Sequence, residues 1–163
     1  MNLDVDDLRF ITALDRAAQG TEAFDVVVSI GAIPDSRWVA HRIAPSRRIL
    51  CASPAYLRQA PPLQIPVDLV QHACLVLREN AEDDGETIRQ WCVAGKGIML
   101  RSEWDVAEGL ATGTLVPLLP HYRAPDADIT ALVPQSRIAS TRARLFTTAL
   151  KQAFRPRPPW RPA

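Results

Sequence analysis

The sequence predicts an α/β fold, arranged as one domain or as two small lobes. Four short apolar runs have the length and composition of buried strands, at residues 24–30, 49–52, 73–77 and 97–100. Between and after them lie segments with the one-sided apolar spacing of amphipathic helices. A chain of 163 residues, of which 47% are hydrophobic, is long enough to bury an ordinary core.

The overall composition argues against several classes of protein. The formal net charge is +1, from 19 basic and 18 acidic residues, so no field of the whole chain attracts nucleic acid or an anionic membrane. The three cysteines are widely spaced and stand in apolar runs, which predicts buried thiols in a reducing compartment rather than a disulfide or zinc framework. The first ten residues are acidic rather than basic, so we expect no signal peptide and a cytoplasmic protein.

The first half of the chain contains two predicted helices and two predicted strands. Acidic residues followed by apolar ones predict a helix from about Asp6 to Ala18. The β-branched run FDVVVSI, residues 24–30, predicts a central strand of a parallel sheet. A loop with a short extended stretch follows, at residues 38–43. The strand ILCA at 49–52 should then turn directly into a short helix, with Ser53 as N-cap and Pro54 in the first helical position.

The second half of the chain alternates strands and helices. A short helical turn precedes a second buried strand, Ala73–Leu77, and a helix then runs to about Ala94 with Ile88, Trp91 and Cys92 inward. Further strands are predicted at residues 97–100, 115–119 and 129–133, with a short helix from Ser102 or Glu103 to Leu110. The last helix begins near the N-cap Ser140, and its predicted inward stripe is Phe146, Ala149, Leu150, Ala153 and Phe154.

Three features suggest chemistry, and each also has a plain structural explanation. The run ENAEDDGE, residues 79–86, could hold a cation, but it lacks spaced ligands and suits a solvated loop that begins a helix. His72 could be catalytic or a metal ligand, yet no second ligand lies at helical spacing, so a structural role is favoured. The basic residues after Ser140 could bind phosphate, although a solvated helix face and a flexible polyproline end explain them better.

Several stretches resemble one known family. RRILCASPAYL at 47–57 and VAGKGIMLRSEWDVAEGL at 93–110 are its most specific matches, and PVDLVQHACLVLREN at 66–80 adds a third. These stretches are similar to the effector-binding domain of LysR-type transcriptional regulators. Residues 1–20 resemble the first helix of that family's winged helix-turn-helix, with no recognition helix after it. The resemblance therefore divides the chain into a remnant at 1–20, a partial effector-binding domain at 21–155 and a flexible tail at 156–163.

The resemblance also implies a fold and a site. It implies an incomplete, two-lobed α/β domain like a type 2 periplasmic binding protein, with apparent deletions near residues 20–24 and 80–83. The ligand-binding residues that it implies, in a cleft between the lobes, are Ser29, Gly31, Asp83, Asp84, Gly85 and Gly97. Ser29 stands where the family generally has arginine, and a serine offers an acid only a weaker, neutral hydrogen bond.

The expected partners follow from the same resemblance. They are a small-molecule effector and further copies of the chain or of its relatives, with no membrane, no cofactor, no metal and no catalytic residues. DNA is expected at the level of the family and not for this chain alone, because four aspartates outnumber two arginines in residues 1–20. A free oligomerising module that acts on full-length relatives and a stand-alone small-molecule binding protein remain the alternatives.

Overall fold

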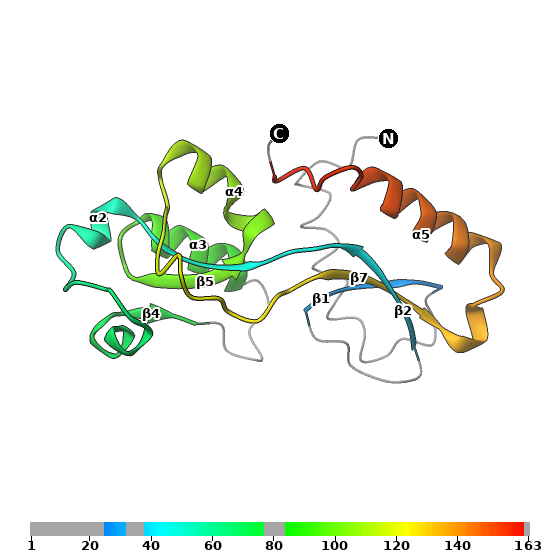
Figure 1. Cartoon of the computed structure of the whole chain (residues 1–163), viewed down its shortest axis with the longest axis horizontal. Helices are drawn as coiled ribbons and strands as arrows, with labels where there is room; N and C mark the ends of the chain where they lie inside the picture. The colour runs from blue at the N-terminus through cyan, green and yellow to red at the C-terminus, as the bar shows by residue number, and fades with distance from the viewer. Residues whose placement is uncertain (1–24, 32–37, 77–83, 162–163) are drawn as a thin grey trace. The chain divides into compact units, whose positions relative to one another are not determined.

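The chain folds into two compact units, each with its own sheet. A computed structural model describes residues 25–31, 38–76 and 84–161 (Figure 1). Unit 1 comprises Met1–Arg47 together with Asp126–Ala163, and unit 2 comprises Arg48–Pro125. The predicted helix at 6–18 and the two apparent deletion points, at 20–24 and 80–83, lie outside the described residues. Both units contain helices and strands, as predicted.

The sheet of unit 1 is antiparallel. It contains β1 (Val27–Ile30), β7 (Ile129–Pro134) and β2 (Trp38–Ala44), in the order β1-β7-β2. The prediction that β1 is a central strand of a parallel sheet was wrong, because among the described residues β1 pairs only with β7, in the antiparallel direction. An apolar run indicates that both faces of a strand are buried, but it gives neither the direction nor the identity of the neighbours. The centre belongs to β7, whose first five residues are all buried.

The other strand of this sheet was predicted only as an extended stretch within a loop. It forms β2, which pairs with β7 along its length and has an irregular register between Arg42 and Ala44. Its mixed burial explains the weak signal in the sequence, since the burial of its residues does not alternate cleanly.

Helix α5 (Thr141–Ala153) begins where the sequence predicts. The side chain of Ser140 accepts a hydrogen bond from the Ala143 backbone N–H at 3.4 Å. The predicted inward stripe was partly wrong, because Phe146 and Ala149 are exposed. The buried positions include Ala143, Thr147 and Leu150, and the first two are too small or too polar for an apolar pattern to detect. The helix contacts β2.

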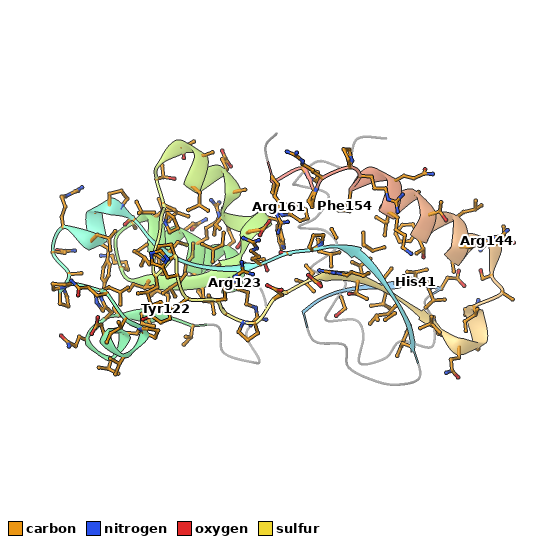
Figure 2. The ribbon with its side chains drawn as sticks, viewed as in Figure 1. His41, Tyr122, Arg123, Arg144, Phe154 and Arg161 are labelled. Carbon is orange, nitrogen blue, oxygen red and sulfur yellow. The ribbon has the colours of Figure 1, made fainter. Side chains whose placement is uncertain are left out.

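The segment after α5 packs against Phe154, the residue that ends the helix. Trp160 is only 7% exposed, and its ring meets that of Phe154 edge to face at a centroid distance of 5.6 Å. The Arg161 backbone N–H donates to the carbonyl of Pro158 at 3.0 Å. The flexible tail at 156–163 stays a prediction, although in the described residues up to 161 a large aromatic side chain packs against the end of α5. Figure 2 shows Phe154 and Arg161 on this C-terminal stretch.

The sheet of unit 2 is mixed. Its order is β4 (Cys74–Leu75), β5 (Ile98–Ser102), β3 (Arg48–Ala52) and β6 (Val116–Pro117). Strand β3 lies antiparallel to β5 and β6, while β4 runs parallel to β5. The predicted burial of β3 holds for Cys51 and Ala52, whereas Ile49 and Leu50 are half-buried.

The turn after β3 forms as predicted. The side chain of Ser53 accepts the Tyr56 backbone N–H at 3.4 Å, and Pro54 opens the helix α2 (Pro54–Leu57). This turn leads to the 3₁₀ helix η2 (Pro66–Gln71), where Asp68 accepts the backbone N–H groups of Gln64 and Ile65. These backbone bonds, that to Ile65 first, hold the pKa of the Asp68 carboxyl below its usual value.

Two helices pack on the sheet of unit 2: α3 (Asp84–Val93) and α4 (Glu103–Thr112). Their core cluster with β3 and β5 consists of Cys51, Ile88, Cys92, Met99, Val106 and Leu115. Ile88 and Cys92 face inward as predicted, but Trp91 is 53% exposed, so that part of the prediction was wrong. Apolar residues at helical spacing are not all buried when the sheet beneath the helix is narrow.

The short strand β4 also differs from its prediction. Cys74 and Val76 are exposed, although the sequence predicts a buried strand and three buried thiols. β4 has only two residues, and its described strand partner is β5, so few neighbours cover it. The remaining described element is the 3₁₀ helix η3 (Gln135–Arg137) after β7. In the part of the chain that the structure describes, no helix is long and apolar enough to cross a membrane.

Candidate functional site

A pocket lies in unit 1, where the three strands of its sheet meet the loop before β7. Its volume is about 270 Å³, and its walls are formed by Gly31, Ala40, Arg42, Asp126, Asp128 and Thr130. β2, β7 and the end of β1 each contribute to it. The pocket thus combines two carboxylates, one guanidinium and one hydroxyl at the edge of a sheet, an arrangement suited to a small polar ligand.

The register of the sheet explains why these side chains meet. Thr130 on β7 is the direct partner of Ser29 on one side and of Arg42 on the other. Directly opposed residues of antiparallel strands point to the same face, so these three residues form one polar row across the sheet. Ala40 lies two residues before Arg42 and shares its face, which adds a small apolar patch to the wall.

Asp128 holds the pocket together. Its carboxylate accepts the Ser46 backbone N–H at 3.1 Å through Oδ1, and its Oδ2 forms an ion pair with Nε of Arg42 at 2.7 Å. Its backbone carbonyl accepts the Gly31 N–H at 3.0 Å. Gly31 has a φ of 93°, a left-handed conformation that favours glycine, so the chain can leave β1 sharply at the rim. Through these contacts Asp128, the residue before β7, is connected to the ends of β1 and β2.

Arg42 and Asp126 face solvent more freely. The side chain of Arg42 is 62% exposed, and its Nε atom forms the ion pair with Asp128. Asp126 is exposed and makes no hydrogen bond or ion pair with the residues that the structure describes. Both groups are therefore open to a ligand, whereas both carboxylate oxygens of Asp128 already have partners.

The predicted site residues are divided between the two units. Gly31 lines the pocket, and Ser29 belongs to the same polar row but is 3% exposed. Asp83 lies outside the described residues, and Asp84 is the first residue of α3. Gly85 and Gly97 belong to unit 2. A ligand role for any of the six remains a prediction.

The two predicted site glycines in unit 2, Gly85 and Gly97, have a packing role. A Cβ atom on Gly85 would lie 2.9 Å from Nη2 of Arg101, whose Nε–H donates to Asp105 at 2.6 Å. The guanidinium therefore covers the first turn of α3. A Cβ atom on Gly97 would lie 2.4 Å from the backbone oxygen of Ala73, which also accepts the Ile98 N–H at 2.8 Å. Glycine at 97 thus permits the close approach of the chain that precedes β4.

This contact makes a Gly97→Ala substitution informative. We expect it to lower the free energy of unfolding by about 1 to 3 kcal/mol, because the added methyl group meets backbone that cannot move aside cheaply. Urea denaturation followed by circular dichroism measures the effect. Gly113→Ala gives the effect of backbone strain alone, about 1 to 2 kcal/mol, since its Cβ would meet nothing within 4 Å and its φ is +74°. A Gly97→Ala variant of unchanged stability would show that the glycine is not needed for packing.

The residues that suggest enzymatic chemistry have structural partners. The hydroxyl of Tyr56 lies 3.2 Å from Nδ1 of His72 and accepts the Ala73 backbone N–H at 3.0 Å. The hydrogen bond with Cys92, together with burial, raises the pKa of the Cys51 thiol, so this thiol is protonated at neutral pH. Among the described residues, no group of three or more histidine, cysteine or acidic side chains could hold a metal ion.

The prediction missed Arg42, Asp126, Asp128 and Thr130. Arg42 and Asp128 stand 86 positions apart, and no spacing pattern joins them. The pairing of β2 with β7 brings them together, and the sequence contained no sign of that pairing.

Comparison with known proteins identifies the domain. The model of the family described as the LysR substrate binding domain matches residues 80–155. The transcriptional activator TtdR of Escherichia coli strain UTI89 is 37% identical over 138 residues, which cover 70% of this chain and 44% of TtdR. The chain is similar to LysR-type transcriptional regulators, and residues 80–155 match their substrate binding domain. The transcriptional regulator DmlR of Escherichia coli K12 is 32% identical over 157 residues, covering 82% of this chain and 51% of DmlR.

Solved structures of LysR-type regulators support the fold. The regulatory domain of CrgA from Neisseria meningitidis has a TM-score of 0.65 and 24% identity, covering 78% of this chain and 74% of that one. Full-length AphB from Vibrio cholerae has a TM-score of 0.63 and 27% identity, covering 79% and 51%. The α/β fold like that of type 2 periplasmic binding proteins is thus confirmed. The chain spans about half the length of these curated LysR-type relatives.

Proposed function

We propose that this chain is the effector-binding part of a LysR-type transcriptional regulator and that a small molecule binds in the pocket of unit 1. One observation carries the proposal: Arg42, Asp126 and Thr130 line a pocket whose rim is tied together by Asp128. Open polar groups held by a rigid sheet can bind and orient a small ligand with little reorganisation. The similarity to LysR-type regulators supports a ligand-binding role for such a pocket.

The partners in this proposal come from the family rather than from the geometry. A regulator of this class acts on DNA as an oligomer, so we place this chain with further copies of itself or with full-length relatives in the cytoplasm. DNA enters only at the level of the family, because no segment of the sequence supplies a recognition helix. The relatives are regulators rather than enzymes, and the proposal assigns no catalytic residue.

Calorimetric titration of the purified chain with a panel of small polar metabolites tests the proposal. We expect at least one compound to bind, and an Arg42→Ala substitution to weaken its binding tenfold or more. Arg137→Ala is the matched control, since Arg137 is an exposed arginine of the same unit, pairs with Asp25 at 2.8 Å and does not line the pocket. Equal losses in the two variants, or no binding by any compound, would contradict the proposal.

A further inference from the structure

The charges of the pocket indicate which kind of molecule it can hold. Its walls contain one cation, Arg42, and two carboxylates, Asp126 and Asp128. Arg42 and Asp128 are paired at 2.7 Å and so offset each other. Among the described residues of the lining, the remaining formal charge is that of Asp126, which makes them negative by one unit in total.

The hydrogen-bonding capacity of the pocket points the same way. Both oxygens of Asp128 already have partners, a hydrogen bond from the Ser46 N–H and an ion pair with Arg42. The carboxylate of Asp126 has no partner among the described residues and can accept several hydrogen bonds. A ligand group that donates hydrogen bonds and carries positive charge would satisfy it best, whereas a carboxylate beside it would be repelled.

We infer that the effector is a small molecule with an ammonium group, such as an amine or an amino acid, and that Asp126 binds this group. The inference rests on the proposed function and names the ligand class for its pocket. In an amino acid, the carboxylate would meet the guanidinium of Arg42, whose ion pair with Asp128 is made through Nε. A dicarboxylate would instead place a second negative group against Asp126.

The size of the pocket limits the ligand further. A volume of about 270 Å³ lies just below the range of about 300 to 1,000 Å³ that is usual for ligand sites. The effector should therefore be a small molecule. This restriction makes a short series of compounds with the same carbon chain a suitable set of probes.

Three four-carbon compounds test the inference: succinate, 4-aminobutyrate and 1,4-diaminobutane. They differ mainly in whether each end of the chain is a carboxylate or an ammonium group. Calorimetric titration of the full chain should show that at least one of the two amines binds at least tenfold more tightly than succinate. Asp126→Asn should weaken amine binding tenfold or more and should not weaken succinate binding. Glu108→Gln, which removes an exposed carboxylate of α4 in unit 2, should leave all three affinities unchanged.

The outcomes separate this inference from the proposed function. Tighter binding of succinate than of both amines, lost in Arg42→Ala, would overturn the inference and leave the proposed function standing. An Arg42-dependent ligand from the metabolite panel that lacks an amine would likewise overturn the inference alone. Amine binding that is equally strong in Asp126→Asn would overturn the assigned role of Asp126. Absence of binding by every probe and every panel compound would overturn both proposals.

Discussion

A Trp160→Ala variant is expected to lose about 3 to 5 kcal/mol of unfolding free energy, the range for removing a buried aromatic side chain. Trp160 is 7% exposed and meets the ring of Phe154, itself buried, at 5.6 Å. Its removal leaves a cavity over the end of α5 and releases the segment that follows the helix. Chemical denaturation followed by far-ultraviolet circular dichroism measures the loss.

Trp91 offers a matched control for this prediction. It is a tryptophan of α3 with 53% of its surface exposed, so Trp91→Ala should change the unfolding free energy by about 0.5 kcal/mol or less. The contrast between the two variants separates burial from the general effect of losing an indole. A Trp160→Ala variant as stable as Trp91→Ala would show that the C-terminal segment is not anchored.

The second large effect is expected at Ile98. This residue of β5 is 1% exposed and packs in a cluster with Ala52 and Tyr56. Ile98→Ala should lower the free energy of unfolding by about 2 to 5 kcal/mol, because it removes packing contacts and leaves a cavity that the sheet cannot close. The same denaturation experiment gives the value.

Two leucines calibrate that result. Leu100 lies on the same strand but is 42% exposed, so Leu100→Ala should have a much smaller effect. Leu50, the cross-strand partner of Leu100, is half-buried against the cluster of Ile98, and its truncation should fall between the two. If Leu50→Ala proved as costly as Ile98→Ala, the core of unit 2 would extend further along β3 than the structure indicates.

Local features were predicted well wherever one residue or a short run decides them. Ser53 with Pro54, and Ser140 before α5, mark helix starts because a side-chain oxygen can satisfy a backbone N–H only at such a position. The helix that begins at Asp84 and the strands β3, β5 and β7 were likewise predicted to within a few residues. The resemblance to LysR-type regulators also depends on such short stretches, and the comparisons confirm it.

Features that depend on distant neighbours were predicted poorly. Val27 and Val28 are buried as their sequence indicates, yet apolar character alone could not show that β1 pairs antiparallel with a strand about a hundred residues later. Cys74 and Trp91 are residue types that are usually buried, yet both are exposed here because few elements cover their positions. Trp160 lies in a proline-rich stretch, and its contact with Phe154 could not be predicted from that composition.

The sequence by itself therefore determined the α/β class, the helix starts and the resemblance to LysR-type regulators. Only the tertiary structure decided which side chains share the pocket. Arg42, Asp128 and Thr130 come together through the pairing of β2 with β7, and Asp126 through the loop that leads into β7. Such contacts depend on the register between strands that are far apart in the sequence. Local propensity and spacing do not encode that register.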